Sequence, residues 1–132
     1  ADPHLLERAR RACYPKTSQR DVPDSWHIAF EHSGEEYCLR ANYRGTVRFL
    51  EQDIRQAFPQ GRFDLILCRN LVFTYFSIEL QQRLLAELQL RLYAGGALVI
   101  GAHEALPGAA AGLAHWPGAQ AIFRLGGAEP AR

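Results

Sequence analysis

The stretch that decides the fold is Phe63–Phe76, FDLILCRNLVFTYF, which passes from an apolar segment through a polar pair into an aromatic cluster. Leu65–Leu67 shows no polar alternation, and such a run is typical of a strand covered on both faces in a parallel sheet. We therefore predict a central strand over Asp64–Cys68. Arg69 and Asn70 follow it directly. Open α/β sheets bind ligands at the carboxyl ends of their strands, so the functional site is expected here.

The segment after this stretch predicts a helix and a second strand. Ser77 is a good N-cap residue, and Gly95-Gly96 is typical of a helix C-terminus. Ala97–Ala102, ALVIGA, predicts the second buried strand, so the unit is a right-handed βαβ motif with parallel strands. His103-Glu104 would then lie at the same edge of the sheet as the residues that follow the first strand. The helix is expected to bury Leu80, Leu84, Leu85, Leu88 and Leu92 and to turn Gln81, Gln82, Arg83, Glu87 and Arg91 outward.

The rest of the chain predicts a single domain over residues 1–132, with a β-hairpin subdomain at residues 26–43 inside it. The turn of that hairpin is Ser33-Gly34. Its outer edge could accept a peptide by strand addition, although most hairpins only cover a core. The other expected elements are a helix from Asp2 to Cys13, a loop over Tyr14–Pro23, short strands at Val47–Leu50 and Gln120–Leu125, and a frayed tail over Gly126–Arg132.

Composition excludes some classes of function. The 15 basic and 14 acidic residues nearly balance, which argues against bulk attraction to nucleic acid or to an anionic membrane. No apolar run approaches the roughly 18 residues of a membrane span, so no membrane insertion is expected. The three cysteines, Cys13, Cys38 and Cys68, are widely spaced. We therefore expect neither a disulfide framework nor a metal site, and a cytoplasmic location.

Several segments of the chain match one known family. The most specific is F-D-x-I-x-C-R-N at Phe63–Asn70, followed by Tyr75-Phe76. Other matching positions are Val47-Arg48-Phe49, Asp53-Ile54, Gln81, Leu92, Gly95-Gly96, Leu98, Gly101 and Glu104-Ala105-Leu106. On these residues, which extend over most of the chain, the sequence resembles the CheR-type methyltransferases. These enzymes use S-adenosylmethionine (SAM) to methylate glutamate side chains of chemoreceptors.

The resemblance implies a partial Rossmann-like α/β methyltransferase fold with a small antiparallel β-subdomain, which would be the predicted hairpin. It implies SAM as the cofactor and an acidic side chain of a protein as the methyl acceptor, with chemoreceptor glutamates as the expected substrate. In some members of the family the β-subdomain binds a peptide tail of the receptor.

The resemblance also implies which residues form the site. Those matching Asp53 and Ile54 flank the adenine of SAM, and those matching Asn70 and Leu71 contact the cofactor beneath the site of methyl transfer. The tyrosine matching Tyr75 lies beside the transferred methyl group, which makes it the expected catalytic residue.

The chain departs from the family in two ways. The tyrosine follows the asparagine by four residues in related enzymes but by five here, so Thr74 could take the place of Tyr75. The family's glycine-rich first loop, the acid that ends its second strand and its N-terminal helical domain are not found in this sequence. We therefore expect this chain alone to bind SAM weakly or not at all, and to self-associate through exposed apolar surface.

The expected chemistry agrees with the absence of a Ser-His-Asp set. A methyl group would pass from a cationic sulfonium to a carboxylate that is already ionised near pH 7, so no strong general base is needed. Alignment of the reactants can contribute about 7 to 11 kcal/mol. Residues that orient the reactants, such as Asn70 and Tyr75, are therefore expected.

Each candidate residue also has a structural interpretation. Asn70 could be only a turn residue, and Tyr75 could be a core aromatic. Arg69 is expected to form a structural ion pair. His103-Glu104 could border the substrate entrance but is not expected to be catalytic. Cys68 is expected to be a buried, unreactive thiol.

Two functions from different classes follow. The first is a SAM-dependent methyltransferase that acts on protein glutamates. The alternative is a truncated or degenerate methyltransferase fold that serves as a regulatory or peptide-binding module.

Overall fold

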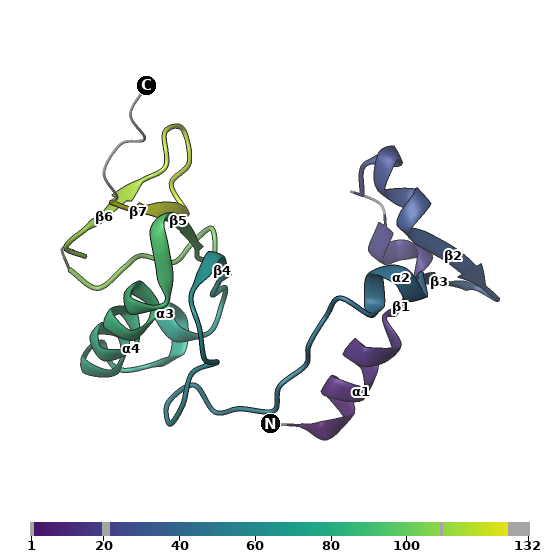
Figure 1. Ribbon diagram of the computed structural model, residues 1–132, viewed down its shortest axis with the longest axis horizontal. Helices are drawn as coiled ribbons and strands as arrows, with labels where there is room; N and C mark the ends of the chain where they lie inside the picture. The colour runs from purple at the N-terminus through teal and green to yellow at the C-terminus, as the bar shows by residue number, and fades with distance from the viewer. Residues whose placement is uncertain (1, 20–21, 109, 127–132) are drawn as a thin grey trace. The chain divides into compact units, whose positions relative to one another are not determined.

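The computed structural model describes residues 2–19, 22–108 and 110–126. It contains two compact units, Ala1–Asp53 and Ile54–Arg132, which we call the N-terminal and C-terminal units and describe separately (Figure 1). Within the described residues, no helix has the length and apolar character needed to cross a membrane. The predicted C-terminal tail lies outside the described residues from residue 127 onward.

The N-terminal unit begins with helix α1, Pro3–Arg11. The Asp2 carboxylate accepts a hydrogen bond from the His4 N–H at 2.9 Å, which satisfies one of the free donors of the first turn. The helix ends at Ala12, whose φ of 50° is left-handed and whose N–H donates to the Arg8 carbonyl oxygen. The predicted N-terminal helix and its capping carboxylate are therefore confirmed.

A three-stranded antiparallel sheet follows, in the order β1-β3-β2. Strands β2, Phe30–Ser33, and β3, Glu36–Leu39, form the predicted hairpin. Its turn contains Gly34 at a φ of 62°, which a tight hairpin turn favours. The hairpin strands are shorter than predicted. The other elements of this unit are β1 (Cys13–Pro15), the 3₁₀ helices η1 (Lys16–Gln19) and η2 (Asp24–Ala29), and helix α2 (Ala41–Arg44).

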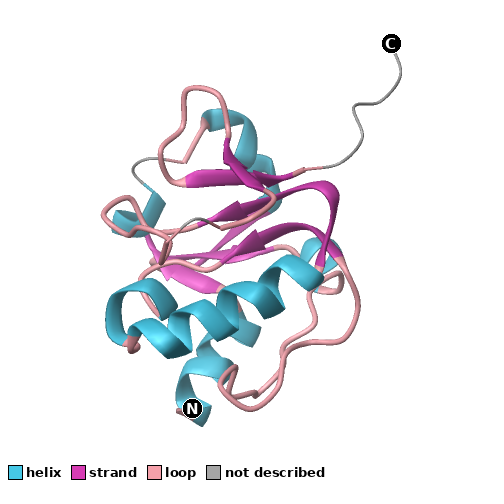
Figure 2. Cartoon of the chain, turned by 90° about the vertical axis from the view of Figure 1, so that its left-hand side faces the viewer, coloured by secondary structure: helices cyan, strands magenta, loops and turns pink. Residues whose placement is uncertain are grey.

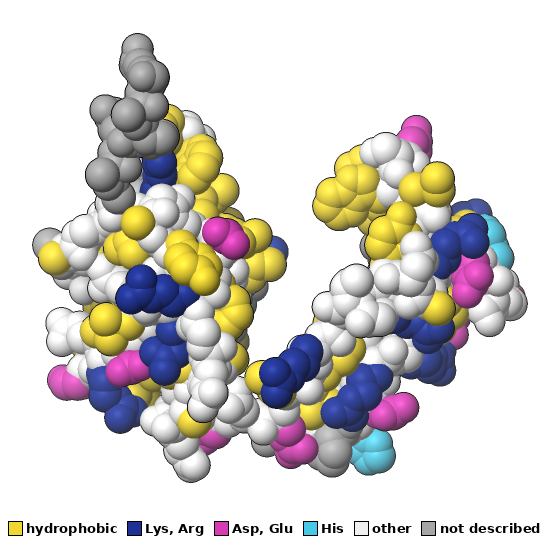
Figure 3. All heavy atoms as spheres, viewed as in Figure 1, with side chains coloured by type: hydrophobic (Ala, Val, Ile, Leu, Met, Phe, Trp, Pro, Cys, Tyr) yellow, Lys and Arg dark blue, Asp and Glu magenta, His cyan; other side chains and the backbone are white. Residues whose placement is uncertain are grey.

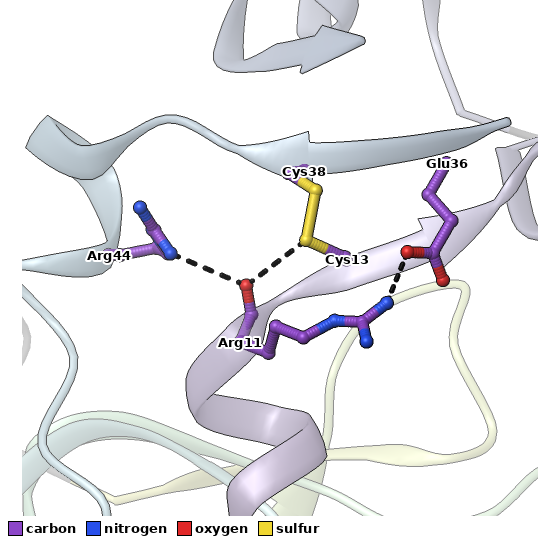
Figure 4. A network of polar contacts seen from close by, with 5 residues as sticks. All are labelled: Arg11, Cys13, Glu36, Cys38 and Arg44. Carbon is purple, nitrogen blue, oxygen red and sulfur yellow. Dashed lines mark hydrogen bonds and ion pairs between the residues drawn. A yellow bond between two sulfur atoms is a disulfide. The ribbon is translucent and has the colours of Figure 1, made fainter. Parts of the chain in front are cut away.

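A disulfide joins β1 to β3. Cys13 and Cys38 lie directly opposite each other on these strands, and their sulfurs are 2.04 Å apart, as Figure 4 shows. The expectation that the cysteines would not pair is wrong for these two, while Cys68 is free and buried. Spacing along the sequence misled the prediction, because strand pairing brings together two cysteines that are 25 residues apart.

Polar contacts around Arg11 reinforce this junction (Figure 4). The Arg11 guanidinium forms an ion pair with Glu36 on β3. The Arg11 carbonyl oxygen accepts a hydrogen bond from Arg44 Nη1 at 3.5 Å. It also lies 3.4 Å from Cys13 Sγ, which is a packing contact because a disulfide sulfur carries no proton to donate. The end of α1 is thus fastened to both β3 and α2.

The C-terminal unit is a four-stranded sheet in the order β4-β5-β7-β6. Strand β4 runs parallel to β5, and β7 runs antiparallel to both β5 and β6. Figure 2 shows α4 lying along one face of the sheet. The elements are β4 (Phe63–Leu67), α3 (Val72–Tyr75), α4 (Ile78–Leu90), β5 (Leu92–Val99), β6 (Leu113–His115) and β7 (Ile122–Leu125). The predicted βαβ motif, the helix cap at Ser77 and the last strand are confirmed.

The prediction that β4 is a central strand is wrong. Strand β4 pairs only with β5 among the described residues, and Leu65 and Leu67 are 55% and 66% exposed. The predicted strand at Val47–Leu50 is also wrong, because no regular element occurs from 45 to 62 and this segment has no paired neighbour.

The two glycines at 95 and 96 do not cap the helix but belong to β5. A Cβ atom on Gly96 would lie 2.9 Å from the Tyr93 carbonyl oxygen and 3.1 Å from that of Asp64. The pairing register between β4 and β5 shifts between Phe63 and Leu65. The two backbones approach closely at this irregularity, and Gly96 permits the approach because it has no side chain.

The core of this unit lies between α4 and the sheet. Leu84, Leu98 and Ile100 are at most 1% exposed. Gln81 was expected to face solvent, but it is buried, and its side-chain Nε2 donates to the Phe76 carbonyl oxygen at 2.8 Å. This bond ties α4 to the end of α3. The remaining buried members of the core are Cys68, Val72, Phe73, Leu85, Leu88, Leu92 and Phe123.

We expect the Cys13–Cys38 disulfide to stabilise the N-terminal unit. Closing a loop of this length restricts the unfolded chain and is worth about 3 kcal/mol. Reduction of the protein, or the Cys13→Ala substitution, should lower the free energy of unfolding of this unit by about that amount. Urea unfolding followed by Trp26 fluorescence in a Trp116→Phe background measures it.

The C-terminal unit supplies the control for this experiment. The transition reported by Trp116 in a Trp26→Phe background should respond less to reduction than the Trp26 transition, since both bonded cysteines lie in the N-terminal unit. An identical Trp26 transition in the oxidised and reduced protein would contradict the stabilising role.

Candidate functional site

A cavity of about 410 Å³ opens beside β4 in the C-terminal unit. Its walls come from the segment before β4, from β4 itself, from the residues that follow it and from α4. They are largely apolar, which suits a flat hydrophobic group. The lining residues are Ile54, Phe58, Pro59, Phe63, Leu65, Ile66, Leu67, Cys68, Arg69, Leu71, Leu88 and Arg91.

Arg91, at the end of α4, fixes one wall of this cavity. Its Nη1 donates to Glu87 Oε2 at 2.6 Å, and its Nε donates to the Pro59 carbonyl oxygen at 3.2 Å. The guanidinium carbon also lies 4.9 Å from the centre of the Phe58 ring, within the range of a cation–π contact. The segment that carries Phe58 and Pro59 is therefore held against α4 although it forms no regular element.

The segment after β4 turns sharply at Asn70. Asn70 has a φ of 54°, a left-handed conformation that asparagine tolerates better than most residues. Leu71 follows and lines the cavity, and helix α3 then begins at Val72. The turn residue thus sets the direction in which the chain leaves the strand.

Glu104 is the centre of a polar cluster at this edge of the sheet. Its Oε2 accepts hydrogen bonds from the Asn70 N–H at 2.9 Å and the Gly101 N–H at 2.6 Å. Its Oε1 accepts a hydrogen bond from Thr74 Oγ1 at 2.5 Å. One carboxylate therefore joins the segment after β4, the end of β5 and helix α3.

These contacts also set the ionisation of Glu104. Partial burial is the largest single influence and raises the pKa of the carboxyl, but it is outweighed. The hydrogen bonds from Thr74 and from the N–H groups of Asn70, Gly101 and Leu71 together hold the Glu104 pKa below its usual range. The group is therefore a carboxylate at neutral pH.

Cys68 has the opposite character. Burial raises the pKa of its thiol; a backbone hydrogen bond with Val72 lowers it, and the negative charge of Glu104 raises it further. The net pKa is above the usual value, so the side chain is a neutral thiol at pH 7. This agrees with the expectation of an unreactive core cysteine.

The structure brings some of the predicted site residues together. Ile54 and Leu71 line the same cavity, and Asn70 immediately precedes Leu71. Tyr75 is 74% exposed on α3 and is not a core aromatic. Asp53 is half-buried and is the last residue of the N-terminal unit.

Thr74 was the alternative to Tyr75, but its hydroxyl donates to Glu104 and is therefore already engaged. Arg69 lines the cavity, and the expectation that it forms a structural ion pair stays a prediction. Among the residues that the structure describes, no cluster of His, Cys, Asp and Glu side chains is arranged to hold a metal.

Sequence reasoning missed the contributions of Phe58 and Arg91. It suggested that Glu104 could border the substrate entrance, which stays a prediction, but it did not foresee that Glu104 joins three segments through two backbone N–H groups and the Thr74 hydroxyl. The position of the Glu104 carboxylate after a buried strand was visible in the sequence. Its hydrogen-bond partners were not, because they depend on the left-handed turn at Asn70. The Phe58–Arg91 contact joins residues far apart in sequence and had no local signal.

The described residues form a mixed α/β structure, with a mixed four-stranded sheet in the C-terminal unit and a small antiparallel sheet in the N-terminal unit. This agrees with the predicted partial Rossmann-like fold class. The parallel strand pair joined by a helix has a cavity along β4 and a polar cluster at its carboxyl edge, the edge where such sheets bind their ligands.

Comparison with known proteins identifies the family. The model of the CheR methyltransferase SAM-binding domain matches residues 1–121. A chemotaxis protein methyltransferase of Listeria monocytogenes is 32% identical over 104 residues, which are 78% of this chain and 39% of the relative. The corresponding protein of Vibrio parahaemolyticus is 34% identical over 108 residues, 79% of this chain and 39% of the relative. An uncharacterized 104.1 kDa protein of Rhodobacter capsulatus is 31% identical over 106 residues, 80% of this chain and 11% of the relative.

The chain therefore belongs to the CheR methyltransferase family, as its resemblance to that family indicated, and the methyl donor of this family is SAM. It spans about two fifths or less of the length of these relatives.

The ionised state of Glu104 predicts a pH-dependent contribution to stability. Because the folded-state pKa is lowered, the contribution is fully present above the unfolded value of about 4.3 and is lost as the pH falls through the lower folded value. The Glu104→Gln variant should have a lower melting temperature than the wild type at pH 7, and the difference should shrink towards pH 3. Melting curves of both proteins across this range test the prediction, and a difference that does not change with pH would refute it.

Proposed function

We propose that the protein containing this chain is a SAM-dependent methyltransferase that methylates side-chain carboxylates of a protein, with chemoreceptor glutamates as the substrate. The observation that carries the proposal is that Ile54 and Leu71 line one cavity that extends along β4, and that Asn70 immediately precedes Leu71. The relatives named chemotaxis protein methyltransferases support the reaction and the substrate class.

The chemistry of the cavity suits the adenosyl group of SAM. Ile54, Phe58 and Leu71 would provide apolar surface for the adenine, and the carboxylate of Asp53 would accept hydrogen bonds from the nucleoside. Asn70 would hold the polar part of the cofactor near the site of transfer. When bound, SAM supplies an electrophilic methyl group on a sulfonium ion.

Tyr75 is the residue that we assign to the methyl-transfer site itself. Its side chain is exposed, so its hydroxyl is accessible to an incoming carboxylate. It would orient that carboxylate without removing a proton from it, because a glutamate is already ionised near pH 7. The remaining task of the protein is to align the two groups and exclude water.

We further propose that both units belong to one methyltransferase domain, since the family model extends across the boundary between them. A cytoplasmic location follows from the proposed substrate, whereas the disulfide between Cys13 and Cys38 is the observation that speaks against it. The redox state of these two cysteines in rapidly quenched cells tests the location.

Substitution of Asn70 tests the site assignment. In the full-length protein, Asn70→Ala should lower the transfer of labelled methyl groups to receptor glutamates by about tenfold or more, the effect of losing one hydrogen bond to a charged ligand. The matched control is Asn42→Ala, which removes the other asparagine of the chain from an exposed position on α2. Wild-type transfer rates in Asn70→Ala would rule out the proposed role.

A binding module without methyltransferase activity is the second candidate. The exposed Leu65 and Leu67 on β4 favour it, because β4 pairs only with β5 among the described residues, and apolar side chains along an edge strand can receive another polypeptide. Titration calorimetry with SAM on the full-length protein separates the two functions, since clear binding is expected of the enzyme and none of the module.

A further inference from the structure

Glu104 does not line the cavity, but it contacts three segments at the carboxyl edge of the sheet: the residues after β4, the residues after β5 and helix α3. Its carboxylate accepts hydrogen bonds from the N–H groups of Asn70 and Gly101 and from the Thr74 hydroxyl. Its own N–H donates to the Gly101 carbonyl oxygen at 3.0 Å. This bond closes a turn between Gly101 and Glu104, and it fixes the backbone from which the Glu104 side chain extends.

The residue most affected by this arrangement is Asn70. Its left-handed φ of 54° is less favourable than an extended or helical conformation, and surrounding contacts must maintain it. The Glu104 carboxylate binds the Asn70 N–H, and the next N–H, of Leu71, also interacts with it. Two consecutive donors at the turn are therefore oriented by one anion.

Gly101 makes this close arrangement possible. A Cβ atom at this position would lie 2.3 Å from Asn70 Oδ1 and 2.7 Å from Glu104 Oε2. The Asn70 side chain therefore rests against the backbone at the end of β5, where any larger residue would displace it. The main chain of Asn70 is thus hydrogen-bonded to Glu104, and its side chain lies against Gly101.

We propose that Glu104 is a positioning residue for the methyl-donor site: it holds Asn70 in its left-handed conformation and thereby directs Leu71 into the cavity. This inference rests on the proposed function, because it concerns how the same site is presented to SAM. Glu104 itself touches neither the donor nor the acceptor. It acts through the two residues that follow β4.

A graded series of substitutions tests the proposal. Glu104→Gln keeps the shape and one acceptor oxygen, whereas Glu104→Leu removes every acceptor. Thr74→Val removes a single donor and keeps the carboxylate. The matched control is Glu79→Gln, which neutralises an exposed carboxylate in the first turn of α4.

Two measurements are made on the full-length protein. The first is the affinity for SAM by titration calorimetry. The second is the amide hydrogen exchange of Asn70 and Gly101 without ligand, which reports the positioning contacts independently of any activity. Glu104→Leu should weaken SAM binding by about tenfold or more, the effect of losing hydrogen bonds to a charged group, and should speed exchange at both amides. Glu104→Gln and Thr74→Val should show smaller effects of the same kind, and Glu79→Gln should match the wild type.

The outcomes separate this inference from the proposed function. If the wild type does not bind SAM, the proposed function fails and the inference fails with it. If the wild type binds and Glu104→Leu binds equally well, only the inference is overturned, even when exchange is faster, because Glu104 would then be purely structural. Unchanged exchange at Asn70 and Gly101 also overturns it. Should Glu104→Leu not fold, Glu104→Gln and Thr74→Val decide the question by the same two measurements.

Discussion

The site depends on one carboxylate that accepts hydrogen bonds from three different segments. Glu104 follows β5, but its partners lie after β4, at the end of β5 and on α3. Hydrogen bonds to an ionised acceptor are stronger than those between neutral groups. Without this anion, the N–H groups at the Asn70 turn would lose their protein partner, and the left-handed residue would lose the contact that orients it. A single side chain thus links the geometry of two parallel strands.

A second constraint shapes the apolar side of the site. The leucine face of α4 packs on the sheet, and Arg91 at the end of the same helix holds the irregular segment at Phe58 and Pro59. The part of the cavity wall formed by Phe58 and Pro59 is therefore held by the helix and not by a strand. Strand β4 leaves Leu65 and Leu67 exposed, and Figure 3 shows hydrophobic side chains at the surface of this unit among basic ones.

The sequence predicted what local patterns determine. The helix after Ser77, the parallel strand pair and the hairpin around Gly34 follow from periodicity, capping and turn chemistry. It did not predict that β4 lies at an edge of the described sheet, because an apolar run indicates burial only when neighbouring strands are present. The role of Gly95-Gly96 was also misassigned. These glycines lie in β5, where a close approach between two backbones requires a residue without a side chain, and they do not end the helix.

For the site, local patterns placed Asn70 and Leu71 directly after the strand, and their role in binding stays a prediction. The contacts of Glu104 could not be predicted, because they depend on tertiary geometry. The same limit explains the Cys13–Cys38 bond, whose partners meet only after β1 joins the hairpin.

That bond has a topological consequence. It closes a covalent ring that contains both 3₁₀ helices and the whole of β2. A protease that cleaves a peptide bond within this ring would open it without releasing a fragment, so the nicked polypeptide would remain one molecule until a reductant separated its two pieces.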